Sequence, residues 1–209
     1  PWSVAHPQAV SQFVLYDANN NSTYWASEDR HLTEWHRITL GSKPQPANSS
    51  LYQPNTQKAL WLAPIANTSI SSPTLELMSV DEQQRQINVW LTPAHAGDTI
   101  TIFLAPNTKL LDWKINGQSL PLENDNFQGW HSLTGFAVPE GGVEMMLKIS
   151  QEADWPEFLL TSVHNDLPKK LTLPPRNAKQ MRGSASSNSD TTVTFERITL
   201  INLITAQRG

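Results

Sequence analysis

The chain has 209 residues, of which 38% are hydrophobic and only 16% are charged, so much of its polarity comes from Asn, Ser, Thr and Gln. This length is enough for one large all-β domain or two small ones, with a buried core. A net charge of −4 and the lack of a basic stripe argue against nucleic-acid binding. The sequence has no cysteine, which excludes disulfides, thiolate catalysis and cysteine metal sites.

The sequence predicts neither a membrane-spanning segment nor a signal peptide. No apolar run approaches the roughly 20 residues that a bilayer-spanning helix needs. The chain opens with Pro1-Trp2 rather than Met, and it shows no signal peptide. We therefore expect a fragment of a longer protein, whose other part could hold a membrane anchor or a catalytic domain.

The first part of the chain predicts a β-hairpin. Period-two alternation dominates the sequence, which is typical of strands. Gln12–Asp17 and Ser22–Ala26 are strand-like, and the Asn-rich stretch between them predicts a turn. Between Asp29 and Leu40 weak helical spacing permits one short helix, and no other helix is expected.

A polar, irregular stretch, Gln45–Thr56, predicts a long loop. It is the only plausible boundary in what we expect to be a single β-rich domain over residues 1–209. In this interpretation an N-terminal hairpin unit, residues 1–44, packs on a sandwich formed by residues 57–205.

The remainder of the chain predicts an all-β fold. The Asn116-Gly117 pair predicts a type I′ hairpin turn, because both residues accept a positive φ. About eleven short strands, separated by turn signals that include 15 Pro and 9 Gly, predict a β-sandwich, either Ig-like or jelly-roll-like. The strand-like segments are Thr74–Val80, Arg85–Thr92, Thr99–Leu104, Leu111–Leu120, Val143–Ser150, Glu157–Val163 and Thr191–Ile201.

Eight tryptophans could fill the core or form platforms for sugar rings. Most of them lie in strand-like segments, which favours the core. Trp90 and Trp113 are out of phase with their aliphatic neighbours, so these two residues are the candidate ligand or partner surface.

The candidates for catalysis or metal binding are weak. His31 and His36 are five residues apart, which does not place them on one helical face. His164-Asn165-Asp166 is a His-x-Asp triplet without a second ligand cluster nearby in sequence. No G-x-S-x-G or phosphate-binding glycine motif is present. A glycosidase pair of carboxylates distant in sequence stays open.

Four stretches together resemble the C-terminal extracytoplasmic domain of membrane-anchored zinc aminopeptidases, the relatives of the endoplasmic reticulum metallopeptidase and the vacuolar membrane protease. In that family a dizinc peptidase domain and several membrane helices precede a β-rich domain. The stretches are Tyr16–Ala18 with Thr23–Asp29 and Leu32–Trp35; Ala105–Gln118; His164–Pro168 with Leu173–Arg176; and Leu173–Leu200.

The resemblance implies a non-catalytic accessory domain that lies in the periplasm or another extracytoplasmic space. Its implied partners are its own peptidase domain and membrane helices, and it would shape substrate access, stabilise the peptidase or bind a partner. Zinc is expected in the absent peptidase domain and no cofactor in this fragment. Asp81-Glu82 precedes His164 and no His follows it, so the order of the family's ligand motifs fails and no catalytic residue or metal ligand is carried over.

The run Gly183–Asp190 is then a variable connection before a last strand rather than an active-site lid. We expect Asp190 to fix the entry to that strand by bonding nearby backbone N–H groups. Two alternatives stay open: a carbohydrate-binding β-sandwich module with an exposed Trp pair, and a free-standing β-sandwich hydrolase with convergent carboxylates. Contact with a peptide or a glycan is compatible with the first of these and with the accessory domain.

Overall fold

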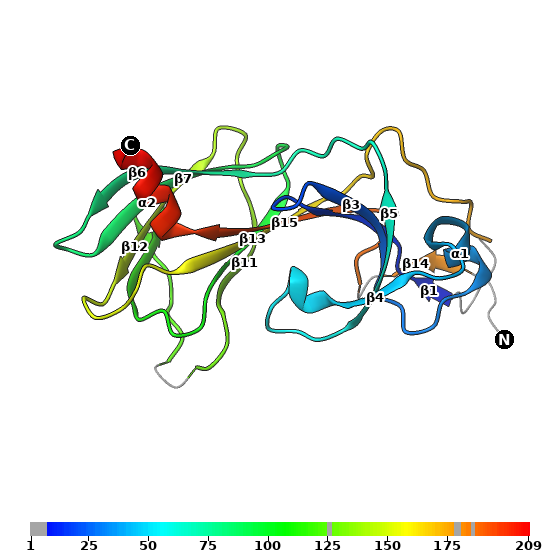
Figure 1. Cartoon of the computed structure of the whole chain (residues 1–209), viewed down its shortest axis with the longest axis horizontal. Coiled ribbons are helices and arrows are strands. Elements are labelled where there is room, and N and C mark those ends of the chain that lie inside the picture. The colour runs from blue at the N-terminus through cyan, green and yellow to red at the C-terminus, as the bar shows by residue number, and fades with distance from the viewer. Residues whose placement is uncertain (1–7, 125–126, 178–180, 185–186) are drawn as a thin grey trace. The chain divides into compact units, whose positions relative to one another are not determined.

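The computed structural model describes residues 8–124, 127–177, 181–184 and 187–209 (Figure 1). Trp2, His6 and part of the run Gly183–Asp190 lie outside these residues. The described chain is rich in strands and has two short α-helices, as expected for an all-β fold. Neither of these helices has the length and apolar character that crossing a membrane requires.

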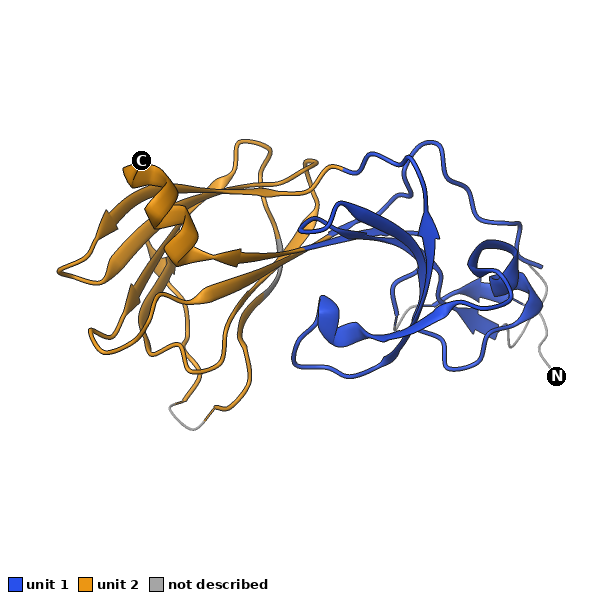
Figure 2. Cartoon of the chain, in the orientation of Figure 1, with its two compact units in different colours: residues 1–70, 163–195 blue, residues 71–162, 196–209 orange. Residues whose placement is uncertain are grey.

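The chain divides into two compact units, and neither of them is continuous in sequence (Figure 2). Unit 1 consists of Pro1–Ile70 and Val163–Phe195, and unit 2 consists of Ser71–Ser162 and Glu196–Gly209. The chain passes from unit 2 back to unit 1 within strand β13 (Glu157–His164). It returns to unit 2 within strand β15 (Thr192–Thr199). The division therefore differs from the boundary expected at residues 45–56, and an element boundary alone would not have located it.

Unit 1 is built on parallel and antiparallel pairing around one central hairpin. The hairpin of β2 and β3 is the one expected from the sequence, with Val14 opposite Trp25. The first half of β15 runs parallel to β2, with Thr192 opposite Val14. The strands of this unit are β1 (Gln8–Val10), β2 (Phe13–Asp17), β3 (Ser22–Ser27), β4 (Gln45–Asn48), β5 (Ala59–Ile65) and β14 (Met181–Gly183).

The hydrogen-bonded order of the largest sheet is β11-β8-β13-β15-β2-β3-β5-β4, and β1 pairs with β14 in a separate parallel ribbon. The segment expected to be a loop, Gln45–Thr56, instead contains β4 and a short 3₁₀-helix, Ser49–Leu51. Pro46 and the lack of alternation hide β4 in the sequence. A proline is tolerated there because β4 is the last strand of the order, with one side unpaired.

Helix α1 (Glu34–Leu40) lies within the interval expected to hold a short helix. It begins after Thr33, whose backbone N–H donates to Nδ1 of His36 at 3.0 Å. His36 thus takes the place that Glu or Gln usually has in a capping box. The helix ends at Gly41, which has a φ of 73° and donates its N–H to the Arg37 carbonyl at 2.9 Å.

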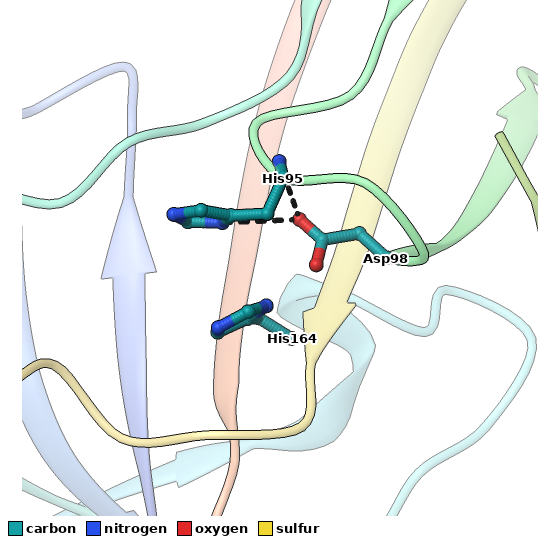
Figure 3. A group of neighbouring side chains, drawn as sticks. All are labelled: His95, Asp98 and His164. Atoms are coloured by element: carbon teal, nitrogen blue, oxygen red, sulfur yellow. Dashed lines mark hydrogen bonds and ion pairs between the residues drawn. The ribbon is translucent and has the colours of Figure 1, made fainter. Parts of the chain in front are cut away.

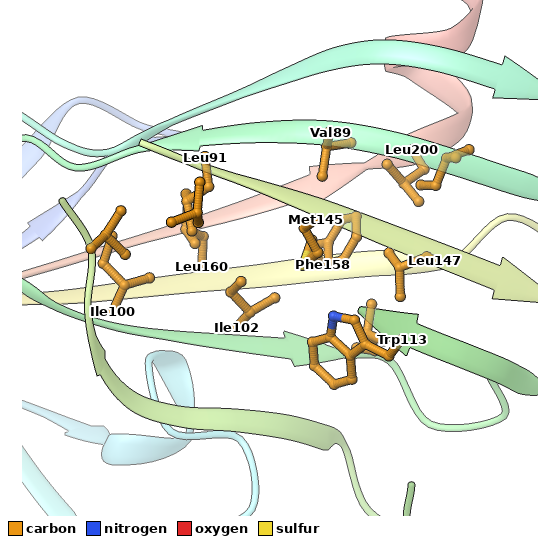
Figure 4. Packing of buried hydrophobic residues seen from close by; sticks show 14 residues of the cluster. Val89, Leu91, Ile100, Ile102, Trp113, Met145, Leu147, Phe158, Leu160 and Leu200 are labelled. Carbon is orange, nitrogen blue, oxygen red and sulfur yellow. The ribbon is translucent and has the colours of Figure 1, made fainter. Parts of the chain in front are cut away.

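Unit 2 is a β-sandwich, as its alternating strands predicted. A five-stranded sheet has the order β10-β9-β12-β7-β6, and β11, β8 and β13 supply the facing layer. Figure 4 shows side chains of the two layers meeting in one hydrophobic core. The strands are β6 (Thr74–Asp81), β7 (Gln86–Thr92), β8 (Thr99–Leu104), β9 (Leu110–Ile115), β10 (Gln118–Ser119), β11 (His131–Ala137) and β12 (Val143–Ile149).

The period-two pattern of the sequence accounts for this core. On β7 the residues Ile87, Val89 and Leu91 are buried, and the residues between them are half-buried. On β12 Val143, Met145 and Leu147 alternate in the same way, and Met145 lies opposite Val89. The turn between β9 and β10 has φ values of 48° at Asn116 and 78° at Gly117, which confirms the predicted type I′ turn.

The end of the chain departs from the expectation. A strand was predicted to reach Ile201 and no second helix was expected, but β15 ends at Thr199 and helix α2 (Leu200–Arg208) follows. Leu200 and Ile204, four residues apart, are both buried. This spacing gives one apolar helical face, which is hard to recognise in the sequence because the segment is short and follows directly on a strand.

Candidate functional site

The two tryptophans selected from the sequence lie in different environments. Trp113 is only 3% exposed and belongs to the core of unit 2, where Figure 4 shows it among aliphatic side chains. It is not an exposed platform. Its register opposite Leu147 turns the ring inward, whereas the sequence phase suggested an outward direction.

Trp90 is half-buried on the opposite face of β7 from the core. Its indole Nε1 donates to the carbonyl of Gly141 at 3.0 Å. A Cβ added to Gly142 would lie 2.4 Å from the same Nε1, so the ring lies directly on the turn between β11 and β12. The structure thus gives Trp90 a packing role. None of the seven tryptophans among the described residues is fully exposed.

A buried carboxylate is the most unusual polar group of unit 1. Glu28, directly after β3, is 9% exposed. The Tyr52 hydroxyl donates to its Oε1 at 2.5 Å, Asn188 Nδ2 donates to the same oxygen at 3.0 Å, and the Asn188 backbone N–H donates to Oε2 at 3.3 Å. Burial, and then the charge of Glu28, raise the pKa of Tyr52. The hydroxyl therefore stays protonated and remains a donor.

Ser11 joins three other segments to this carboxylate region. Its Oγ donates to the Asn188 carbonyl at 2.6 Å, and its backbone N–H donates to Asp29 Oδ2 at 2.7 Å. Its own carbonyl accepts from Ser27 Oγ at 2.6 Å. Residues 11, 27–29 and 188 are thus bonded to one another although 177 positions separate the first from the last.

Asp29 also holds a buried histidine. His36 Nε2 lies 2.8 Å from Asp29 Oδ2, and His36 Nδ1 accepts the backbone N–H of Thr33. Because Nδ1 accepts, the proton of the neutral ring is on Nε2 and points to the carboxylate. An Asp–His pair can activate a nucleophile only through the second ring nitrogen. Here that nitrogen is bonded to the helix N-terminus, so the pair orients α1.

Arg176 forms the third part of the network. Its guanidinium makes a two-pronged ion pair with Asp190, at 2.9 and 2.7 Å, and lies 4.8 Å from the centre of the Trp35 ring. The Trp35 indole donates to the Pro174 carbonyl at 3.1 Å. The Asp190 side chain therefore binds Arg176 rather than the backbone N–H groups that we had expected it to bind. The backbone N–H of Asp190 donates to the Gln12 carbonyl.

We call these contacts of Ser11, Glu28, Asp29, His36, Tyr52, Arg176, Asn188 and Asp190 the polar network. Three of the four stretches that carry the family resemblance contribute to it, and the remaining one, Ala105–Gln118, lies in unit 2. The Thr192 hydroxyl adds a bond to the carbonyl of Asp166, in the His164-Asn165-Asp166 triplet, at 2.7 Å. The network ties the segments of unit 1 together, and pairings this far apart in sequence cannot be found from local patterns.

Asp98 shows the same structural use of a carboxylate in unit 2. It is buried and accepts the backbone N–H of His95 at 3.1 Å, and its Oδ2 lies 3.3 Å from His95 Nδ1. Figure 3 draws both interactions as dashed lines. The Asp98 N–H in turn donates to the His95 carbonyl. These bonds close the turn before β8. His164, which Figure 3 also draws, ends β13 and belongs to unit 1.

A polar groove of about 810 Å³ lies in unit 1. Hydroxyl and amide side chains dominate its lining. Among the described residues that line it, Tyr24 supplies the one aromatic ring, and this residue is half-buried. Neither Trp90 nor Trp113 lines it.

Comparisons with known proteins assign no family to the chain. No family model matches, and no curated protein matches either. Among solved structures, the chain is similar to the Mu homology domain of Fcho1 from Danio rerio, determined with a bound Eps15 peptide. The sequence identity is 8%, the match covers 92% of this chain and 96% of that chain, and the TM-score is 0.33.

Proposed function

We propose that this chain is a non-catalytic accessory domain of a membrane-anchored zinc aminopeptidase, located outside the cytoplasm and, in a bacterium, in the periplasm. One observation carries the proposal. Glu28, Asp29, Arg176 and Asn188, which belong to the stretches that resemble this family, hold distant segments of unit 1 together through hydrogen bonds. Glu28, Asp29 and His36 would be the natural acid, carboxylate and base of a hydrolase, and their hydrogen bonds join strands and a helix.

The accessory role would place the peptidase domain and the membrane helices of the parent protein next to this chain as partners. Zinc would be bound by the peptidase domain. A rigid β-rich body beside an active site can limit which substrates enter, and rigidity is what a long-range polar network provides.

The test uses both the 209-residue chain and its parent. The isolated chain is expected to retain no stoichiometric zinc after dialysis and to release no amine from aminoacyl anilide substrates. Deleting the domain from the parent should change the amount of active peptidase or its substrate preference. Peptidase turnover by the isolated chain that His164→Ala abolishes would overturn the proposal, as would a parent gene without membrane helices and a dizinc motif.

The polar groove supports a second candidate, a carbohydrate-binding module. Its amide and hydroxyl groups can exchange hydrogen bonds with sugar hydroxyls, and the ring of Tyr24 can stack against a sugar face. Titration with soluble oligosaccharides would shift the amide resonances of residues 65–69 if this candidate is right. Shifts that stay unchanged in Tyr24→Ala would exclude stacking on this ring.

A further inference from the structure

A second concave site in unit 1 has a different chemistry from the polar groove. It has a volume of about 540 Å³, and four basic residues, Arg30, His31, Arg37 and Lys43, line it together with Trp61. None of the described residues that line it is acidic. We call it the basic pocket. Three permanent cations in one concavity are unexpected in a chain of net charge −4.

The basic pocket is built by three segments that hydrogen bonds hold in place. Arg30 and His31 follow β3, and the Trp61 indole on β5 fixes this segment by donating to the Asp29 carbonyl at 3.0 Å. Arg37 lies on α1, and its Nη1 donates to the Ser42 carbonyl at 3.2 Å. Gly41, with its positive φ, turns the chain back and so brings Lys43 to the pocket.

The cations of the pocket are poorly neutralised by the protein. Arg37 lies 3.9 Å from Glu34, whose side chain is almost fully exposed, so this pair is weak. In the part of the chain that the structure describes, Arg30 and Lys43 form no salt bridge. Like charges gathered in a concave site repel one another and raise the local concentration of anions. An ordinary solvated face would intersperse charges of both signs.

From this arrangement we infer that the basic pocket binds a phosphate group. A carboxylate carries one negative charge, whereas a phosphate monoester carries about 1.5 to 2 at neutral pH and matches several cations. The planar guanidinium groups of Arg30 and Arg37 suit bidentate contact with phosphate oxygens. Trp61, half-buried, offers a flat apolar wall to the carbon part of the ligand. A pocket of this volume suits a small phosphate ester or the headgroup of one phospholipid.

The first experiment titrates the ¹⁵N-labelled 209-residue chain with inorganic pyrophosphate and, separately, with acetate. We expect saturable shifts of the Trp61 indole and of the amides of residues 30–31 and 41–43 with pyrophosphate, and much weaker binding of acetate. The variant carries Arg30→Gln and Lys43→Gln, because neither side chain holds the pocket wall. Each lost charge-assisted contact should weaken binding about tenfold.

The matched control carries Lys58→Gln and Lys109→Gln, which changes the net charge equally but leaves the basic pocket intact. Its affinity for pyrophosphate should stay within about twofold of the parent, since exposed charges outside a site contribute little. Equal losses in the two double variants, or equal affinity for acetate and pyrophosphate, would show general charge screening and overturn the proposal.

The second experiment distinguishes the two sources of phosphate. The chain is floated with vesicles of phosphatidylcholine alone or of phosphatidylcholine mixed with phosphatidic acid. Retention on the mixed vesicles that the Arg30→Gln, Lys43→Gln variant loses assigns the pocket to a lipid headgroup. Pyrophosphate binding without such retention assigns it to a soluble phosphate ester. Absence of both kinds of binding contradicts a phosphate site.

Discussion

Units 1 and 2 differ in what their interiors bury. Unit 2 has a core cluster of aliphatic residues with Trp113 and Phe158, and its strands alternate cleanly between buried and outward residues. Unit 1 has a smaller apolar cluster around Val14, Trp25 and Leu40. It also buries Glu28, His36 and Ser11, whose hydrogen bonds join distant segments. In an apolar core, removing part of a side chain leaves a cavity and lowers stability. In a buried polar network, removing one hydrogen-bond partner leaves the other unsatisfied and lowers stability.

The largest effect is expected at β15, because this strand contributes to both units. Truncation at Ser189 removes Val193, Phe195, Leu200 and Ile204, all of them buried. Each large apolar side chain contributes ~1.5–3 kcal/mol when buried, and a whole domain is stable by only ~5–15 kcal/mol. The truncated chain should show no cooperative thermal transition. A melt near the parent temperature would mean that neither unit needs the strand.

In the aliphatic unit, Leu147→Ala should cost ~2–5 kcal/mol, since the side chain is fully buried and leaves a cavity. Leu111→Ala is the matched control, because Leu111 is 57% exposed on a neighbouring strand and should cost under ~0.5 kcal/mol. Urea unfolding measures both. Hydrogen exchange then shows whether the loss of protection stays within unit 2. Equal losses of protection in both units would contradict the view that each unit is stabilised by its own interior.

In the polar unit, Tyr52→Phe should cost ~1.5–3 kcal/mol at neutral pH, the range for a buried bond to a charged group. The pKa of Tyr52 is raised in the folded state, above an unfolded value of roughly 10. The contribution of its hydroxyl is therefore fully present below about pH 10 and is lost as the pH rises further.

The measurement for Tyr52→Phe is urea unfolding at neutral pH and at about pH 10.5. The difference between parent and variant should shrink at the higher pH. Tyr16→Phe is the control, because its hydroxyl donates to the neutral amide of Asn21. A pH-independent difference for Tyr52→Phe would show that the bond to Glu28 does not matter for stability.

A substitution in the hairpin turn of unit 2 should lower stability by a smaller amount. Gly117→Val should cost ~1–3 kcal/mol, because a β-branched residue is strained at a φ of 78° although space is open around the position. Gly141→Val is a suitable control, since its backbone φ is not in the left-handed region and no atom crowds it. Thermal melts within a degree of each other would mean that the backbone of this turn adapts.

Arg176→Lys is expected to have the smallest effect, about 1 kcal/mol, because Lys keeps the charge but loses the two-pronged contact with Asp190 and the stacking on Trp35. Asp190 is partly exposed, which limits the loss. Raising the salt concentration should reduce the difference between parent and variant. If Arg176→Lys costs as much as Tyr52→Phe, then the ion pair is a larger part of the polar network than its exposure suggests.

The sequence predicted unit 2 better than unit 1, for a physical reason. Alternation along β7, β8 and β12 is a local pattern that reports directly on burial, and Asn116-Gly117 is a local turn signal. By contrast, β4 and the 3₁₀-helix after it have no alternation, and α2 is too short to show a strong helical period. The candidate surface was less predictable, because the burial of Trp113 depends on its register with β12.

The polar network was beyond prediction from one sequence. In the sequence, nothing distinguishes Ser11, Glu28 and Asn188 from ordinary turn or strand residues. They come together only because residues 163–195 fold back into unit 1. The basic pocket had a weak signal, in that four basic residues occur between positions 30 and 43. The sequence does not reveal that these residues line one concavity.

The interrupted course of unit 1 has a consequence for synthesis on the ribosome. Its hairpin, β2 and β3, emerges early, but the partner strand β15 and Asn188 follow more than 150 residues later. Unit 2 likewise receives Leu200 and Ile204 only from the last segment. Neither unit can therefore complete its interior before residues 188–204 have left the ribosome, and until then the hairpin and the Glu28 carboxylate lack partners that they have in the folded unit. A chaperone that shields exposed strands would act during that interval.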